Sequence, residues 1–240
     1  MTSTPEISFV IPVFNEEAIL HAAVVDLRER LAPHGLSYEL ILAENGSRDA
    51  TAQIAQKLGA RYPELRLVQT PTPNYGAALR QGILSARGEW VICEEIDLCD
   101  VDFHLQALAL LRSGSADFVI GSKLIGGSRD ERPLLRHTAS QLYTGLLHLL
   151  FDFRGTDTHG LKAFRRTLIA PIAEICQVDR DVFASELVIR AYREPLKIVE
   201  IPVRVLEKRP PSINLLRRLP NVAKNLVQLV WAIRMKRSFR

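Results

Sequence analysis

The stretch WVICEEIDLCD at residues 90–100 joins an apolar run to four acidic side chains. The run Trp90–Cys93 is typical of a buried strand, and the acids that follow it are Glu94, Glu95, Asp97 and Asp100. Carboxylates are costly to bury unless positive charge lies beside them. A divalent cation that carries a substrate diphosphate supplies such charge at the carboxyl end of a strand in an α/β sheet. The stretch therefore predicts a nucleotide-dependent transferase site or, alternatively, an acidic loop that caps the next helix.

Composition predicts an ordinary globular protein. The 240 residues are 47% hydrophobic and 24% charged, enough to bury one full core in one domain. The cysteines fit no zinc pattern and are odd in number, so we expect a reducing compartment without disulfides; they are Cys93, Cys99 and Cys176. The first residues lack the pattern of a signal peptide, and the expected location is therefore cytoplasmic.

Positive charge is concentrated at the carboxyl end of the chain. Residues 204–240 hold ten Lys or Arg and one acid, a charge of +9, so the total of +4 leaves −5 for residues 1–203. This asymmetry indicates an anionic partner, either nucleic acid or the cytoplasmic face of a membrane. The same segment is too short and too polar to span a bilayer. It is expected to form an amphipathic helix that lies at the membrane interface with Trp231, that packs on the domain, or both.

Alternating apolar runs and helical periodicities predict four consecutive strand–helix units. The expected strands are 7–13, 38–43, 66–69 and 90–93, and the expected helices are 17–31, 50–58, 75–86 and 103–113. A further strand is expected at 118–122, a loop at 126–133 and a helix at 137–153. Asn15 is expected to cap the first helix. This order predicts an α/β fold with a wound, mostly parallel sheet flanked by helices.

Polar motifs follow the first, second and fourth strands, where ligands of open α/β sheets bind. They are Pro12–Glu16, Glu44–Asp49 and Glu95–Asp97, and Asn74–Gly82, Ala86–Trp90 and Asp157–Arg166 accompany them. As an ordered set these motifs resemble the inverting family 2 glycosyltransferases with the GT-A fold. Within that family the resemblance is to the dolichol-phosphate (polyprenyl-phosphate) mannosyltransferase branch. It implies a GT-A domain at residues 1–212, followed by a basic amphipathic helix at 213–240 without a transmembrane span.

The resemblance also implies a donor site. Glu95 and Asp97 stand at the family's Asp-x-Asp positions and are the expected metal ligands, holding Mn²⁺ or Mg²⁺ on the diphosphate. Cys99 stands where the branch often has Gln and is a poor ligand for a hard cation, so Asp100 or water is expected there. The expected nucleotide-sugar-binding residues are Pro12, Phe14, Asn15, Glu16, Glu44, Gly76, Glu95, Asp97, Lys123 and Arg209.

The implied acceptor needs little activation, because a phosphate monoester with a second pKa of roughly 6 is largely ionised near neutrality. Positioning and charge would then supply the catalysis. The resemblance implies Asp97, Arg209 and Arg136 as catalytic residues and Arg129, Arg136 and His159 as acceptor-phosphate residues. Solvated surface charge is the alternative for Lys123, Arg129 and Arg136. His159-Gly160-Leu161 replaces the family's Ser-Gly-Phe, so the acceptor pocket is expected to differ.

A second apolar segment offers a place for a lipid acceptor. It could dip into a membrane, or it could belong to the core or a dimer interface; its residues are Leu142, Leu146, Leu147, Leu149, Leu150 and Phe151. With the basic carboxyl-terminal segment, it predicts peripheral contact with the cytoplasmic face of a membrane and allows a membrane-protein partner.

The leading hypothesis is inverting transfer of a hexose, namely mannose from GDP-mannose, to a polyprenyl phosphate. A UDP-sugar donor carrying glucose or N-acetylglucosamine is the alternative within this class, because no residue separates guanine from uracil. A non-catalytic nucleotide-sugar or lipid-phosphate binder is the alternative from another class. Nucleic acid is not the expected partner, since aromatic side chains are sparse near the basic residues.

Overall fold

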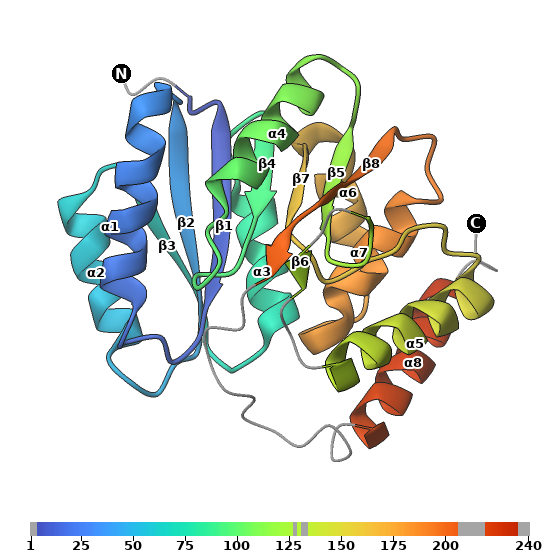
Figure 1. The fold of residues 1–240 in the computed structure, drawn as a ribbon. Helices are drawn as coiled ribbons and strands as arrows, with labels where there is room; N and C mark the ends of the chain where they lie inside the picture. The colour runs from blue at the N-terminus through green and yellow to red at the C-terminus, as the bar shows by residue number, and fades with distance from the viewer. Residues whose placement is uncertain (1–3, 127–128, 131–133, 206–218, 235–240) are drawn as a thin grey trace.

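A seven-stranded sheet organises the computed structural model, which describes residues 4–126, 129–130, 134–205 and 219–234. The strand order is β3-β2-β1-β4-β7-β5-β8 (Figure 1). The strands are β1 Ile7–Val13, β2 Tyr38–Asn45, β3 Leu65–Thr70, β4 Trp90–Cys93, β5 Phe118–Ser122, β7 Lys162–Arg165 and β8 Ile198–Pro202. A small second sheet pairs β6, Arg129–Asp130, with β9, Arg204–Val205.

The sheet is mostly parallel, as predicted. β1 runs parallel to both β2 and β4, β2 runs parallel to β3, and β5 runs parallel to β8. β7 is antiparallel to its neighbours β4 and β5, and the motif pattern did not predict this insertion. The chain winds outward from β1 to β3 and then crosses back to β4, so the order reverses at β1 and β4, the position at which open α/β sheets bind ligands.

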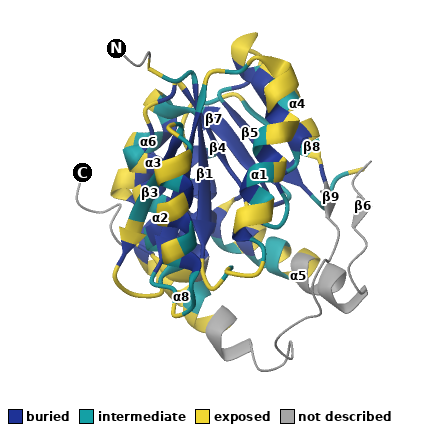
Figure 2. Cartoon of the chain, turned by 90° about the vertical axis from the view of Figure 1, so that its left-hand side faces the viewer, coloured by how far each residue is buried: buried dark blue, intermediate teal, exposed yellow. Residues whose placement is uncertain are grey.

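Helices cover both faces of the sheet and form two apolar cores (Figure 2). One core joins the sheet to α1 Leu20–Leu31, α2 Thr51–Arg61 and α4 Val101–Arg112. The other joins it to α3 Tyr75–Ser85, α5 Leu134–Phe151, α6 Arg166–Ile175, α7 Phe183–Ala191 and α8 Leu219–Arg234. Figure 2 shows the strands buried between these layers, which explains the near-continuous apolar runs of β1 and β4.

The first helix begins later than its sequence predicts. α1 starts at Leu20 rather than residue 17, and its buried residues are the predicted Leu20, Val24, Leu27 and Leu31. The prediction that Asn15 caps this helix is wrong, because Ile19 occupies the cap position. Asn15 instead has a positive φ of 53°, and its side chain accepts a hydrogen bond from the loop after β2. The side chain therefore joins two loops rather than capping a helix.

The apolar segments at α5 and α8 each divide between core and surface. Leu147 and Phe151 of α5 are buried, and so are Leu229, Ala232 and Ile233 of α8, which packs on the domain. Other large apolar side chains of these helices are exposed, namely Leu142, Leu149, Val227 and Trp231. Among the described helices, none combines the length and apolar content that crossing a bilayer requires.

A close approach of two glycines fixes the chain before β7. A Cβ atom on Gly160 would lie 1.7 Å from the backbone oxygen of Gly121 in β5, so no larger residue fits without backbone movement. By contrast, a Cβ atom on Gly59 in α2 would meet only ordinary contacts, the nearest being a Leu65 side-chain atom at 3.5 Å.

We expect Gly160→Ala to lower the free energy of unfolding by about 3 kcal/mol, because overpacking against backbone cannot relax cheaply. Gly59→Ala is the control and should raise it by up to about 1 kcal/mol, because alanine is the better helix former. Urea denaturation followed by circular dichroism measures both. Equal stability of the two variants would contradict the close approach.

Candidate active site

The carboxyl ends of β1, β2 and β4 meet at one edge of the sheet. Val13 of β1 lies opposite Glu44 of β2, and Val10 of β1 lies opposite Cys93 of β4. The three predicted strand-end motifs therefore start side by side.

Hydrogen bonds fasten the loop after β1 to the loop after β2. The backbone N–H of Asn15 donates to Ser47 Oγ at 3.0 Å, and the N–H of Arg48 donates to Asn15 Oδ1 at 2.9 Å. The N–H of Glu16 donates to Thr51 Oγ1 at 2.7 Å. Phe14 lies beside these bonds and is 39% exposed, so its ring can meet a ligand. The predicted nucleotide-binding turn is thus rigid and presents an aromatic ring.

Two other predicted donor residues are buried. Pro12 lies within β1 opposite Ala43, and Glu44 is 3% exposed. Glu44 Oε1 accepts the N–H of Ser47 at 2.5 Å, which shapes the loop after β2. A role of either residue in nucleotide binding stays a prediction.

Glu95 and Asp97 form the acidic centre of this edge. The Glu95 side chain reaches solvent, but surrounding protein desolvates it and raises its pKa. Asp97 and Glu16 raise the pKa of Glu95 further through like charge, whereas Lys162 and Lys123 oppose the rise. Counting Glu95 itself, three carboxylates stand against two lysines here, and a cation would relieve the repulsion among the carboxylates. Carboxylate oxygens are ligands that Mg²⁺ and Mn²⁺ accept.

The other two acids of the stretch have different partners, which corrects the expectation of a single cluster. Glu94 Oε2 lies 2.7 Å from His104 Nε2 of α4, and both side chains are fully buried. Asp100 Oδ1 accepts the N–H of Phe103 at 3.1 Å and caps α4. The capping alternative is therefore confirmed for Asp100. Glu95 and Asp97 stay at the strand edge, and their role in a transferase site stays a prediction.

Because Glu94 and His104 are buried together, we expect the stability of the protein to depend strongly on both side chains. His104→Leu should lower the free energy of unfolding by about 3–5 kcal/mol, because it leaves the Glu94 carboxylate buried without its partner. The double variant Glu94→Met/His104→Leu should recover most of that loss, since no charge then remains to be desolvated. Urea denaturation compares the two variants. A double variant as unstable as the single one would show that loss of packing, not the unpaired carboxylate, dominates.

Cys99 shapes the acidic turn from within. It is 5% exposed and has a positive φ of 39°, and its carbonyl oxygen accepts Nη1 of Arg30 at 3.0 Å. Its Sγ lies 3.5 Å from the carbonyl oxygen of Ile96. These contacts give Cys99 a structural role.

Two lysines bring positive charge to the acidic centre. Lys123 Nζ lies 3.2 Å from Asp157 Oδ2. Burial alone would raise the pKa of Asp157. The charge of Lys123 and the hydrogen bond from the backbone N–H of His159 outweigh burial and hold the pKa of Asp157 below its usual value. Lys162 in β7 was not singled out from the sequence, yet it is 3% exposed and donates to the Gly160 carbonyl oxygen at 2.6 Å. Burial lowers its pKa, and nearby anionic groups, including Glu95, oppose that shift.

Gly76 lies where α3 meets the segment before α7. A Cβ atom there would approach the Arg180 carbonyl oxygen to 2.5 Å and Phe183 Cβ to 2.6 Å. Asn74 strengthens the contact, because its Oδ1 accepts the N–H groups of Ala77 and Arg180. Packing therefore accounts for the glycine, and its predicted contact with the nucleotide stays a prediction.

The remaining predicted residues are only partly described. His159 is exposed on the loop between α5 and β7. Arg129 lies in β6 and Arg136 in α5, but their side chains lie outside the described residues. Arg209, the predicted phosphate and catalytic residue, also lies outside them, as does the predicted domain boundary at residue 212.

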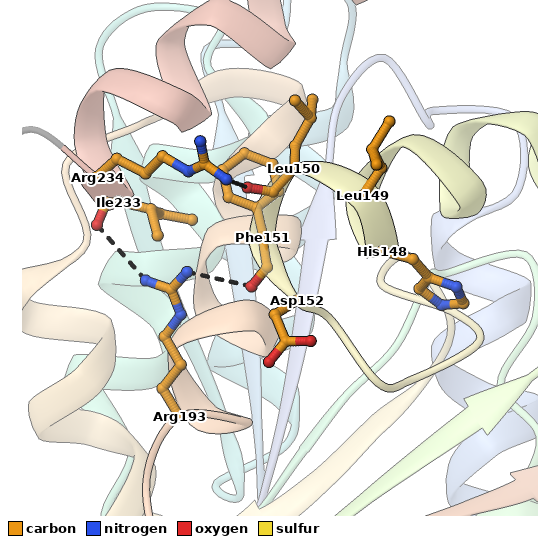
Figure 3. Close-up of a pocket in the computed structure, with 8 residues that line it drawn as sticks. All are labelled: His148, Leu149, Leu150, Phe151, Asp152, Arg193, Ile233 and Arg234. Atoms are coloured by element: carbon orange, nitrogen blue, oxygen red, sulfur yellow. Dashed lines mark hydrogen bonds between the residues drawn. The ribbon is translucent and has the colours of Figure 1, made fainter.

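A pocket of about 580 Å³, which neither Glu95 nor Asp97 lines, lies between the carboxyl ends of α5 and α8 (Figure 3). Its arginines bind helix-end carbonyls: Arg193 donates to Phe151 O at 3.2 Å and to Ile233 O at 3.5 Å, and Arg234 donates to Leu150 O. Cationic side chains at helix carboxyl ends satisfy free carbonyl groups. The pocket therefore belongs to the α5–α8 contact rather than to the acidic centre.

A model of the family described as glycosyl transferase family 2 matches residues 8–172, which include both acids and the cross-linked loops. The chain belongs to this family. Its α/β architecture is of the GT-A type.

Relatives and solved structures agree with this assignment. The chain is 27% identical over 238 residues to the glycosyltransferase AglD of Haloferax volcanii, covering 96% of this chain and 38% of that protein. It is 28% identical over 214 residues to the dolichyl-phosphate beta-glucosyltransferase ALG5D of Trichomonas vaginalis, covering 82% and 64%. A crystal structure of glucosyl-3-phosphoglycerate synthase from Mycobacterium tuberculosis with Mn²⁺ and UDP-glucose superposes with a TM-score of 0.59 at 21% identity, covering 95% and 78%. The chain thus spans less than two thirds of the length of these two sequence relatives.

Proposed function

We propose that this chain transfers glucose from UDP-glucose to a dolichyl-type polyprenyl phosphate. The observation that carries the proposal is the pair of carboxylates, Glu95 and Asp97, held beside the rigid loops after β1 and β2. The name of the Trichomonas relative supports glucose and a dolichyl phosphate acceptor. The expected donor GDP-mannose finds no such support, so the alternative with a UDP-sugar donor replaces it.

A divalent cation, Mn²⁺ or Mg²⁺, fits the acidic centre. The described residues hold no group of three or more His, Cys, Asp and Glu side chains able to form a metal site. We therefore propose that Glu95 and Asp97 would hold the cation together with the donor diphosphate. When bound, the cation would neutralise charge that develops on the departing nucleoside diphosphate. The fold of a synthase crystallised with Mn²⁺ and UDP-glucose is compatible with this arrangement.

The protein side chains would act mainly by positioning. Phe14 offers a ring for the base. Lys123, whose charge Asp157 partly neutralises, supplies positive charge near the diphosphate. The acceptor phosphate is already anionic and needs no dedicated base. Arg136 and Arg209 remain the proposed partners of the two phosphate groups, with His159 and Arg129 on the acceptor side. Orientation of the two substrates would then supply most of the rate enhancement.

Asp97→Asn should reduce transfer at least about 100-fold, because it removes one of the two carboxylates that face the developing charge. Asp102→Asn is the matched control, since Asp102 is an exposed acid in the first turn of α4. Transfer of labelled glucose from UDP-glucose to a short-chain polyprenyl phosphate is measured with Mn²⁺, Mg²⁺ or EDTA, and GDP-mannose serves as the competing donor.

Metal-dependent transfer from UDP-glucose is the expected result. Preference for GDP-mannose would overturn the proposed donor, and wild-type activity of Asp97→Asn would overturn the metal site. Binding of UDP-glucose without product from any acceptor would favour the non-catalytic binder.

We also propose that α5 and α8 dock together on an anionic membrane. The two helices are in contact (Figure 1). Leu142 and Leu149 of α5 are 69% and 78% exposed, and Val227 and Trp231 of α8 are 68% and 52% exposed. In α8, Val227 and Trp231 lie on one face of the helix with the exposed Lys224, because three- and four-residue spacings place side chains on the same face. An apolar stripe with flanking basic residues is typical of interfacial helices.

Leu149→Asp/Val227→Asp should weaken binding to phosphatidylcholine vesicles containing phosphatidylglycerol by about tenfold or more, because two exposed apolar contacts are lost. Leu84→Asp is the control, because Leu84 is an exposed apolar residue on α3. Vesicle flotation measures both variants. Equal binding of the double variant and the control would refute docking through these helices.

A further inference from the structure

The loop between α5 and β7, residues 152–161, is held by polar contacts along much of its length. Thr156 donates its backbone N–H to Glu200 Oε1 of β8 at 2.7 Å, and its hydroxyl bonds to Oε2 of the same carboxylate. The Gly160 carbonyl accepts Nζ of the buried Lys162. His159 stands on this fastened loop as an exposed residue.

Three hydroxyl groups connect α5 and α7 to the His159 ring. Tyr143 Oη of α5 lies 3.2 Å from Ser185 Oγ of α7. Ser185 Oγ lies 2.9 Å from Thr158 Oγ1, and Thr158 Oγ1 lies 3.1 Å from His159 Nδ1. We call this continuous path, from Tyr143 through Ser185 and Thr158 to His159, the hydroxyl chain.

The middle of the hydroxyl chain is buried. Ser185 is fully buried and Thr158 is 3% exposed, so their hydroxyl groups depend on each other for hydrogen bonds. Burial raises the pKa of Tyr143, which therefore keeps its proton at neutral pH. The Tyr143 ring also packs edge-on against the His159 ring, with centroids 5.7 Å apart. The imidazole is thus held both by a hydrogen bond and by ring packing.

Each bond of the hydroxyl chain can run in either direction, but only donation from Tyr143 towards the ring gives every hydroxyl proton an acceptor within the chain. If Tyr143 donates to Ser185, Ser185 to Thr158 and Thr158 to the imidazole, then Nδ1 is an acceptor. A neutral imidazole whose Nδ1 accepts carries its proton on Nε2. We propose that Tyr143, Ser185 and Thr158 are positioning residues that hold His159 as an Nε2–H donor to the phosphate of the acceptor.

The chemistry of the acceptor fits such a donor. A phosphate monoester presents oxygen acceptors, and a hydrogen bond to a charged oxygen is stronger than one between neutral groups. Held in place by Thr158 and Tyr143, the ring would lose little rotational freedom when the phosphate binds. This inference rests on the proposed function for its ligand, but the tautomer and the hydroxyl chain can be tested without any transfer reaction.

The first test is a double-mutant cycle on the acceptor KM. Tyr143→Phe keeps the ring and removes only the hydroxyl, so the acceptor KM should rise about fivefold, the effect of one hydrogen bond, while kcat and the donor KM change less than about twofold. In a His159→Ala background, Tyr143→Phe should have no further effect, because it acts through the imidazole. Tyr38→Phe, at the start of β2, is the matched control and should leave the acceptor KM unchanged.

Additive effects of Tyr143→Phe and His159→Ala would overturn the proposal, because a purely structural role of Tyr143 predicts additivity. Ser185→Ala provides a second variant, which breaks the chain at its buried centre and should show the same dependence on His159.

The second test observes the ring nitrogens directly. In a ¹H–¹⁵N spectrum of the imidazole groups at a pH where His159 is neutral, the signals lost in His159→Ala identify this residue. We expect a protonated Nε2 and an unprotonated Nδ1 in the wild type, and altered His159 signals in Tyr143→Phe. A protonated Nδ1 would overturn the inference even in an active enzyme. The expected tautomer in a protein that neither binds nor glycosylates a prenyl phosphate would overturn the proposed function instead.

Discussion

Repulsion among carboxylates at one edge of the sheet is the constraint on which the site depends. Parallel pairing of β1 with β2 and β4 brings three loop motifs to one place, and with them Glu16, Glu95 and Asp97. Like charge and desolvation both raise the pKa of Glu95, so the edge favours a cation. Lys123, directly after β5, and the buried Lys162 of β7 offset part of this charge. The arrangement suits a cation and a diphosphate that bind together.

Rigidity of the surrounding loops is the second requirement, because positioning replaces acid–base chemistry in the proposed reaction. Side-chain oxygens of Asn15, Ser47 and Thr51 accept backbone N–H groups and so fasten the loops after β1 and β2 to each other. Glu200, Lys162 and the hydroxyl chain fasten the loop that carries His159. The groups proposed to bind the donor and the acceptor thus lie on segments that hydrogen bonds hold in place without any ligand.

Much of this architecture could be predicted from local sequence patterns. The strands at β1, β4 and β5 are mostly apolar runs, and the polar residues that follow them mark the edge at which open α/β sheets bind ligands. The separate role of Glu94 was missed, although alternation along a strand places successive side chains on opposite faces. Its partner His104 lies in α4, and a pair between a strand and a helix depends on packing that the pattern does not encode.

Other features depend on contacts between distant parts of the chain. β7 has four residues and joins the sheet because Gly160 can approach Gly121 of β5, which no local periodicity indicates. The sequence did not indicate Lys162, because lysines are seldom buried. Its hydrogen-bond partner is a backbone carbonyl group, which no side-chain pattern reveals. The choice between glucose and mannose, or uracil and guanine, depends on the shape of several loops together. The relatives therefore guided that choice, whereas no single residue did.

The central claim is that the β1–β2–β4 edge binds the donor diphosphate through a cation at Glu95 and Asp97. A crystal structure of the protein with Mn²⁺ and UDP-glucose, with anomalous data collected at the manganese edge, tests it most directly. The account predicts one anomalous peak within bonding distance of a carboxylate oxygen of Glu95 or Asp97 and of the diphosphate. A bound UDP-glucose with its manganese peak away from both acids would contradict it.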